Sequence, residues 1–313
     1  MYNFQHLKYA VEVERTGSIS KAAKNLFMGQ PHLSKAIMEL EDSIGIAVFN
    51  RSPKGVVPTA RGEEFLRYAK NILAQMDEME ALYRPSESSV RRFDVSVPRS
   101  GYIAHAFTEL AKKLENEKDI ELNYRETNAV SAINNVADNI NSTAVIRFQP
   151  QYEKYFMRAL DERDLLFKPV WEFDYLLMMS GNHPLAAASV IHTTELLQYT
   201  EIFHGDVKIP TLPYSEARRL EKADERRKKI LVYERGSELE LLSRLSTAFM
   251  WGAPEPSGVL ERYSLVQKEC SSSKRRFRDV LIYRRGYRFS AEDNLFMDLL
   301  KESAEEVSKN RLE

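Results

Sequence analysis

The chain of 313 residues has little cysteine, no long apolar run and no large excess of charge of one sign, and each of these absences excludes a class of protein. Its single cysteine, Cys270, excludes a disulfide-stabilised scaffold and a cysteine-based metal cluster. A run of about 18 apolar residues, the length of a membrane span, is missing, and so is a signal peptide, so we expect a soluble cytoplasmic protein. Charge of one sign is lacking too, because 45 basic residues are matched by 46 acidic ones. That balance excludes a uniformly basic nucleic-acid coat and a highly charged disordered tail.

The chain has enough hydrophobic residues to form sizeable cores. Hydrophobic residues make up 43% of the chain, which is ordinary for globular proteins, and the length predicts about two domains. Residues 1–62 carry eight basic and five acidic side chains, a net charge of +3, against −1 for the whole chain. A mildly basic head on an acidic body points weakly to a polyanionic partner, and chance variation explains so small a number equally well.

The first 45 residues predict three short helices joined by tight turns. Gly17 ends the first helix, and Ser18 can cap the second. Pro31 sits at the first position of the third, where a missing N–H is tolerated. An apolar stripe at helical spacing follows, formed by Leu33, Ile37, Leu40 and Ile44. Two short helices joined by a turn are typical of a helix-turn-helix.

The outward face of the third helix carries side chains that suit DNA. The planar amide of Gln30, at the N-terminal tip, can read adenine, and Lys35 suits phosphate or guanine. His32 and Met38 lie on the same outward face, with Ser34 beside them.

A hairpin, or wing, is predicted directly after these helices. Strand-like residues 46–49 and 56–57 flank a Pro-Lys-Gly turn. Arg51 and Lys54 are expected at the tip of this wing, where basic side chains commonly meet phosphates.

One long helix is predicted from Thr59, its cap, to Arg84. Its apolar residues recur at spacings of 4 and 3, which is a heptad pattern. They are Phe65, Ala69, Ile72, Met76, Met79 and Tyr83. We expect this seam to pair two copies of the chain, since no nearby segment is long enough to cover it. The alternative is a helix packed on its own domain.

Beyond a polar linker at residues 85–92, strand-like and helix-like segments alternate. Strands are expected at 93–97, 120–126, 144–148, 175–179, 202–203, 230–233 and 280–283. Helices are expected at 101–115, 129–138, 215–229, 237–245 and 290–308. Such alternation predicts an α/β fold with parallel sheets covered by helices.

Several motifs, in order over residues 3–83, resemble the LysR-type transcriptional regulators. They are Ser18–Leu26, Gln30–Ile37, Leu40–Gly45, Phe49–Arg51 and Thr59–Gly62. The resemblance implies that DNA contacts fall on Gln30, Pro31, Ser34, Lys35, Arg51, Lys54 and Thr59. Ser18, Ser20 and His32, from the same motifs, complete the DNA-binding candidates.

The resemblance also implies a domain plan. It places a winged helix-turn-helix domain at residues 1–58, a linker and dimerisation helix at 59–86, and an effector domain at 87–313. That effector domain would be two α/β lobes resembling periplasmic binding proteins, crossed twice by the chain. The implied protein is a homodimer or homotetramer that binds double-stranded operator DNA and the transcription machinery and needs no cofactor.

An effector site is expected where strands of the two lobes end. Ser100 precedes a helix whose first N–H groups are unpaired, which favours a carboxylate. The following strands bring Thr127, Asn128 and Arg147 to the same rim, and the other lobe contributes His204. We expect a small carboxylate-bearing effector here. The alternative is that these hydroxyls and amides only cap their helices.

Enzymatic interpretations find little support. A Ser-x-x-Lys pattern occurs at residues 18–21 and 271–274, but no Lys-Thr-Gly partner accompanies it. The six histidines lack the i, i+4 pairing of a helical metal site. We therefore predict a DNA-binding regulator that is not an enzyme. Two rivals stay open: a regulator whose C-terminal domain serves assembly only, and a solute-binding or enzymatic α/β protein whose head only dimerises.

Overall fold

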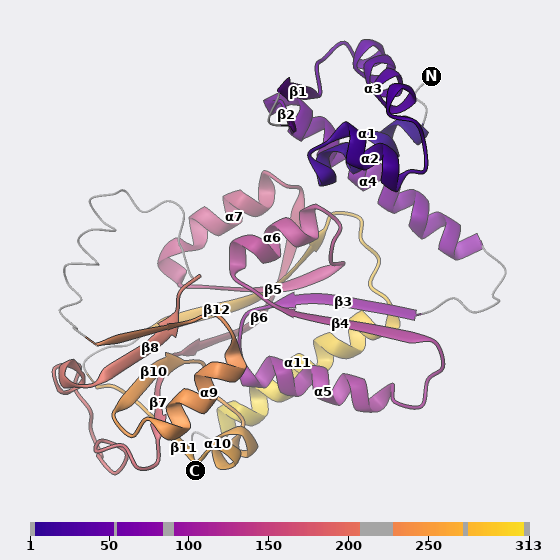
Figure 1. Ribbon diagram of the computed structural model, residues 1–313. Coiled ribbons are helices and arrows are strands. Elements are labelled where there is room, and N and C mark those ends of the chain that lie inside the picture. The colour runs from indigo at the N-terminus through magenta and orange to yellow at the C-terminus, as the bar shows by residue number, and fades with distance from the viewer. Residues whose placement is uncertain (1–3, 53–54, 84–90, 207–227, 272–274, 310–313) are drawn as a thin grey trace. The chain divides into compact units, whose positions relative to one another are not determined.

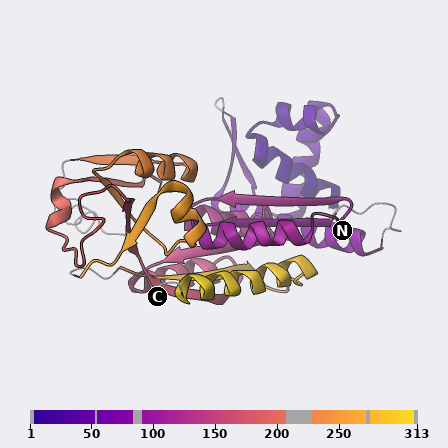
Figure 2. The same cartoon turned by 90° about the horizontal axis from the view of Figure 1, so that it is seen from below.

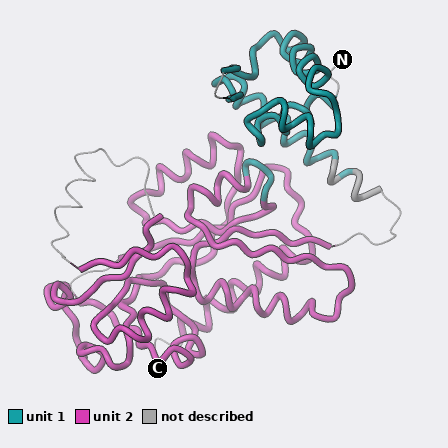
Figure 3. The backbone as a smooth tube through the Cα atoms, viewed as in Figure 1, with its two compact units in different colours: residues 1–89, 137–140 teal, residues 90–136, 141–313 magenta. Residues whose placement is uncertain are grey.

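The computed structural model describes residues 4–52, 55–83, 91–206, 228–271 and 275–309, apart from the side chains of 77, 78 and 80–83. The chain divides into an N-terminal unit, residues 1–89 with 137–140, and a C-terminal unit, residues 90–136 with 141–313 (Figure 3). No helix within the described ranges is long and apolar enough to cross a membrane.

Three helices of the N-terminal unit follow the predicted pattern (Figure 1). They are α1 (Phe4–Thr16), α2 (Ile19–Asn25) and α3 (Gln30–Ile44). Gly17 and Gly45 end α1 and α3 with φ of +62° and +72°, a conformation that glycine adopts without strain. The Ser18 hydroxyl caps α2 by accepting a hydrogen bond from Lys21 N at 3.4 Å. The predicted stripe is buried at Leu33, Ile37 and Leu40.

The wing forms, but its first strand begins three residues later than predicted. Strands β1 (Phe49–Ser52) and β2 (Gly55–Pro58) pair antiparallel. The N–H groups of Val48 and Phe49 instead donate to Oε1 of Glu41 on α3, at 2.8 and 3.0 Å. The Glu41 carboxylate therefore accepts from the backbone N–H groups that a strand beginning at residue 46 would have used for pairing.

The long helix α4 (Ala60–Tyr83) begins against the base of this wing. Thr59 caps it, because the Thr59 hydroxyl accepts a hydrogen bond from Gly62 N at 2.9 Å. The same hydroxyl donates to Ala47 O at 2.7 Å. A Cβ on Gly62 would lie 2.0 Å from Val48 O, so only glycine allows this close approach.

The C-terminal unit contains two lobes, each built on a five-stranded sheet in the described residues. The first lobe has the strand order β4-β3-β5-β12-β6. Its elements are β3 (Arg91–Val97), α5 (Gly101–Lys113), β4 (Ile120–Glu126), α6 (Ala129–Ala137), β5 (Thr143–Phe148), α7 (Glu153–Asp161), β6 (Leu165–Asp174), β12 (Arg276–Arg284) and α11 (Ala291–Lys309).

The second lobe has the strand order β11-β7-β10-β8-β9. Its elements are β7 (Leu176–Ser180), β8 (Thr200–His204), β9 (Lys229–Val232), α9 (Arg235–Arg244), β10 (Ala248–Gly252), α10 (Ser257–Tyr263) and β11 (Leu265–Lys268). Most of the predicted helix at 215–229 lies outside the described residues.

The prediction of purely parallel sheets is wrong. Strands β4, β3 and β5 run parallel, but β12 is antiparallel to both β5 and β6. In the second lobe β8, β9 and β10 are parallel, whereas β7 is antiparallel to β10 and β11. The reason is the double crossing: β6 leads out of the first lobe into β7, and β11 leads back into β12. A returning strand must run against the strand that left.

Helices cover both faces of the first sheet. Figure 2 shows α5 and α11 lying alongside one another, and both contribute to a core that includes Tyr102, Phe93 and Phe296. Helices α6 and α7 cover the other face (Figure 1). There the ring of Phe156 stacks on Phe148 with centroids 5.1 Å apart.

We expect Gly62→Ala to destabilise the N-terminal unit by about 1–3 kcal/mol, because the added methyl group meets backbone that cannot rotate away. Urea unfolding followed by circular dichroism measures the change. Arg61→Ala, at the exposed neighbouring position, is the control and should leave the midpoint unaltered. An unshifted midpoint in Gly62→Ala would contradict the close approach to Val48.

Candidate DNA interface and inter-lobe cavity

The predicted outward face of α3 is exposed. Gln30, His32, Lys35 and Met38 all lie on the surface of the N-terminal unit, and Ser34 is half-buried. The Ser20 hydroxyl of α2 donates to Gln30 Oε1 at 3.0 Å. This hydrogen bond ties the Gln30 amide to the preceding helix and so restricts the direction in which it can read a base.

The prediction that Arg51 lies at the wing tip is wrong, because Arg51 lies within β1. Its guanidinium donates to Ser34 Oγ at 3.1 Å and lies 3.7 Å from the Glu41 carboxylate. The side chain therefore links the wing to α3 while staying partly exposed. Lys54, the other predicted tip residue, lies outside the described residues.

Two predicted DNA-binding residues have structural roles as caps. Ser18 caps α2 and Thr59 caps α4, as described above. Gly29 caps α3 without a side-chain hydrogen bond, and Pro31 follows in the first turn. A phosphate can still meet the N–H groups at such helix starts, so capping does not remove these positions from an interface.

The predicted seam of α4 divides between two faces of the helix. Ala69 is buried in the core of its own unit and Phe65 packs against that core, so the expectation that they pair two chains is wrong. Met76 is half-buried, and the side chain of Tyr83 lies outside the described residues. An exposed apolar stripe remains, at Tyr68 (57% exposed), Ile72 (40%) and Met79 (51%).

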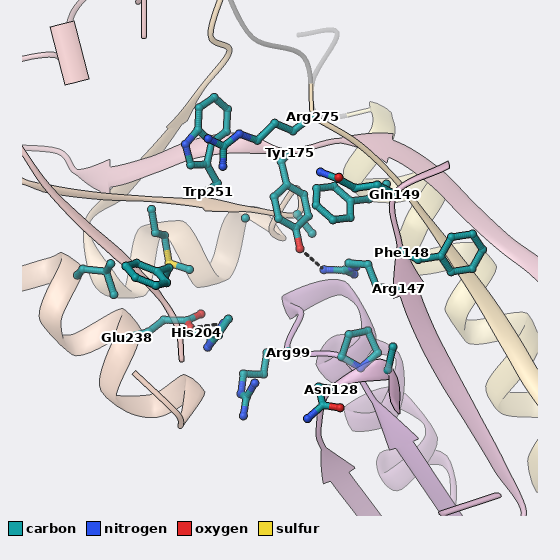
Figure 4. A pocket seen from close by; sticks show the side chains of 18 of the residues that line it. Arg99, Asn128, Arg147, Phe148, Gln149, Tyr175, His204, Glu238, Trp251 and Arg275 are labelled. Carbon is teal, nitrogen blue, oxygen red and sulfur yellow. Dashed lines mark hydrogen bonds and ion pairs between the residues drawn. The ribbon is translucent and has the colours of Figure 1, made fainter. Parts of the chain in front are cut away.

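A cavity of about 460 Å³ lies between the two lobes of the C-terminal unit (Figure 4). Four of the five predicted effector-site residues line it, namely Thr127, Asn128, Arg147 and His204. They lie at the carboxyl ends of β4, β5 and β8, where a two-lobed α/β domain is expected to hold a ligand. Of the four, Asn128 also caps α6, since Ser131 N donates to Asn128 Oδ1 at 2.9 Å.

The fifth residue, Ser100, is buried outside this lining, and the anion site that we predicted beside it is filled by the protein itself. Glu255 from the second lobe accepts a hydrogen bond from Gly101 N at 2.9 Å, at the start of α5. Its second carboxylate oxygen accepts one from Arg235 at 3.0 Å. A Cβ on Gly101 would lie 1.5 Å from Glu255 Oε2, so glycine makes room for this carboxylate. A ligand carboxylate cannot bind at this helix start while Glu255 is there.

Arg147 is also engaged. It donates two hydrogen bonds to Asp279 on β12, at 2.8 and 2.7 Å, and Asp279 is fully buried. Tyr102 donates to the same carboxylate at 2.5 Å. Burial opposes the charge of Arg147, but the Asp279 carboxylate outweighs it and raises the pKa of the guanidinium. The pair is primarily a structural support of the cavity wall.

Arg99, two residues after the end of β3, makes a second contact between the lobes. It binds both carboxylate oxygens of Asp206, at 3.0 and 3.1 Å, and donates to Tyr233 O at 2.5 Å. Burial opposes ionisation of Asp206, but the hydrogen bond and charge of Arg99 outweigh burial and lower its pKa.

The comparisons with known proteins agree with this architecture. Residues 4–63 match the family model described as bacterial regulatory helix-turn-helix protein, lysR family. The BenM regulator of Acinetobacter baylyi is 39% identical over 75 residues, which is 24% of this chain and 25% of BenM. A probable RuBisCO transcriptional regulator of Cyanophora paradoxa is 26% identical over 199 residues, 62% of this chain and 58% of that protein.

The chain carries a helix-turn-helix segment of the lysR family at residues 4–63. Its N-terminal unit is a helix-turn-helix DNA-binding domain of the LysR type. The matched segments span at most about three-fifths of these curated relatives.

Three solved structures match the fold over nearly the whole chain. ArgP from Mycobacterium tuberculosis has a TM-score of 0.65 at 16% identity, covering 97% of this chain and 98% of ArgP. LysG from Corynebacterium glutamicum, solved with bound effector Arg, has a TM-score of 0.60 at 14% identity, covering 97% and 99%. CbnR in complex with its target DNA has a TM-score of 0.53 at 16% identity, covering 97% and 100%.

Sequence reasoning missed several residues of the cavity. Trp251 lies on β10, a strand that was not predicted, and Arg275 lies over its ring at 4.1 Å. Tyr175 and Glu238 also line the cavity. The apolar run Ala248–Trp251 is the signal that could have revealed β10, since a short buried strand needs no alternation.

Acid should weaken the Arg99–Asp206 contact. Because the pKa of Asp206 is lower in the folded than in the unfolded chain, the contact stabilises fully above about pH 4, the ordinary aspartate value. That stability is lost as the pH falls through the folded-state pKa. We expect urea midpoints to fall with pH more steeply in the natural chain than in Asp206→Asn.

Asp164→Asn is the matched control for this titration, because Asp164 forms an exposed ion pair with Arg285. It should retain the steepness of the natural chain. Parallel curves for the natural chain and Asp206→Asn would show that the contact adds no stability.

Proposed function

We propose that this chain is a sequence-specific transcriptional regulator of the LysR type that dimerises through α4 and responds to a small molecule bound between its lobes. It would act in the cytoplasm, where operator DNA and the transcription machinery lie. The observation that carries the proposal is the exposed face of α3, on which Gln30 and Lys35 point away from the core beside the exposed Arg51 of the wing.

DNA binding is supported by the chemistry of this face. A planar amide can pair with adenine, and lysine and arginine displace counterions from phosphates. The helix carrying them is a single rigid element whose stripe is buried, so the side chains are presented from a fixed base. The similarity to CbnR, whose structure was solved with its target DNA, supports the same use of the fold.

A homodimer is supported by the apolar stripe Tyr68, Ile72 and Met79 on α4. These large side chains stay exposed within the N-terminal unit, and their i, i+4 and i+11 positions lie along one line of the helix. A second copy of α4 would bury them. A tetramer, as the resemblance also allows, would need a further interface in the C-terminal unit.

An effector role for the cavity is supported by its volume and its lining. About 460 Å³ lies in the range of small-molecule sites, and aromatic walls with a few polar groups are typical of them. LysG, which has the same fold, was solved with arginine as effector. The rival in which the lobes serve assembly only is favoured by one observation, the filling of the α5 start by Glu255.

Measurements of operator binding test the role of the exposed face of α3 in DNA recognition. Gln30→Ala should cost roughly 1–3 kcal/mol on the cognate operator and flatten the preference at one base, since it removes base contacts. Lys35→Ala should weaken all sequences alike and lower the salt slope by about one, because it removes a phosphate contact. Fluorescence anisotropy on operators selected from genomic DNA measures both.

Arg15→Ala is the control for these titrations, because Arg15 is exposed on α1 and paired with Glu12. Its affinity should match that of the natural chain. Equal losses on specific and random DNA for Gln30→Ala would show that Gln30 reads no base.

Charge in the α4 stripe should produce monomers. The double variant Ile72→Asp with Met79→Asp would bury two carboxylates in an apolar interface and should weaken operator binding strongly. Analytical ultracentrifugation measures the oligomeric state. Ala60→Asp, which adds charge to the exposed first turn of α4, is the control. An unaltered dimer in the double variant would place the interface elsewhere.

A further inference from the structure

One buried carboxylate in the inter-lobe cavity has an oxygen without an aligned hydrogen-bond donor. Glu238, in the first turn of α9, is only 4% exposed and lines the cavity. Its Oε2 forms an ion pair with His204 Nε2 at 2.9 Å but lacks an aligned hydrogen bond, and Nδ1 of His204 has no hydrogen-bond partner either. The position at the start of α9 stabilises the negative charge. A buried carboxylate with an unsatisfied oxygen favours a ligand that brings a donor.

The positive charges around the cavity are largely committed to other partners. Arg99 binds Asp206 and Arg147 binds Asp279, each through two hydrogen bonds. Arg235 binds Glu255, and Arg275 stacks over Trp251. Arg99, Arg147 and Arg235 thus have one carboxylate each, whereas Glu238 is paired with the imidazole of His204.

The acidic surroundings of Glu238 act in the same direction. Glu126 and Glu255 lie near enough that burial first, and the Glu238 charge in addition, raise the pKa of both, while Arg235 opposes the rise. A ligand carboxylate would add to this repulsion. It would also find the start of α5 already occupied by Glu255.

Aromatic side chains supply the rest of the lining. Figure 4 shows Trp251 and Tyr175 on the walls of the cavity that Glu238 and His204 also line. The faces of aromatic rings attract cations as well as apolar groups. The indole Nε1 of Trp251 has no hydrogen-bond partner and can donate to a polar atom of a ligand.

We propose that the cavity takes a small organic cation, an amine or a guanidine, whose charged nitrogen lies against Glu238 and whose apolar part lies against Trp251 and Tyr175. This rests on the proposed function, in which the cavity holds the effector. It replaces the carboxylate-bearing effector that the sequence predicts, because the anion position of that prediction is filled by Glu255.

Matched pairs of probes that differ in charge alone test the ligand class. Tryptamine and indole-3-acetate share one ring system, and phenethylamine and phenylacetate share another. Isothermal titration of the full chain should show binding of both amines, with the two carboxylates weaker by at least about tenfold, the effect of one charge-assisted hydrogen bond. Tighter binding of the carboxylates, or no binding of either amine, overturns the proposal.

Glu238→Gln removes the charge at nearly constant shape and should weaken both amines by about tenfold or more. Glu240→Gln on the same helix is the matched control, because Glu240 is exposed and paired with Arg244. It should bind like the natural chain. Equal amine affinity in Glu238→Gln and Glu240→Gln overturns the role of Glu238. Should Glu238→Gln fail to fold, Glu238→Asp serves in its place, and its amine affinity should exceed its affinity for the carboxylates.

Operator binding without any probe separates this proposal from the function on which it rests. If the chain binds its operator but no amine, the ligand class is wrong and the regulator stands. If the natural chain does not bind operator DNA, the proposed function is wrong, whether or not the amines bind in the cavity.

Discussion

The C-terminal unit depends on how one buried carboxylate, that of Glu255, is satisfied. It belongs to the second lobe, yet its hydrogen bonds come from Gly101 at the start of α5 in the first lobe and from Arg235 at the start of α9. Taking a carboxylate out of water is costly unless such donors are in place. Separating the lobes would break the bond to Gly101, so the carboxylate favours the arrangement in which the cavity is closed on that side.

This arrangement decides what the cavity offers to a ligand. The helix start that would ordinarily attract an anion is already neutralised, and Arg99 and Arg147 are held by Asp206 and Asp279. These pairs fix the walls without leaving a free positive group among them. The aromatic rings, Glu238, His204 and Arg275 then give the cavity its chemical character, and such differences in lining would let one shared fold take different ligands.

Local signals made the N-terminal unit predictable, and long-range pairing made the C-terminal unit less so. The glycines, caps and stripe of α1 to α3 act within a few residues, so they can be identified from the sequence. The direction of β12 depends on the chain's return from the second lobe, and the occupant of the α5 start, Glu255, lies 154 residues from Gly101. Likewise, the exposed face of α4 became clear only once Leu66 and Ala69 were found in the core.

The contact of Gly62 with Val48 has a mechanical consequence. The start of α4 lies against the base of the wing, and Glu41 and Arg51 join the wing to α3. The angle between the helix that faces DNA and the helix proposed to pair two chains is therefore fixed inside one rigid unit. In a dimer formed through α4, the distance between the two DNA-reading helices would be a constant of the protein.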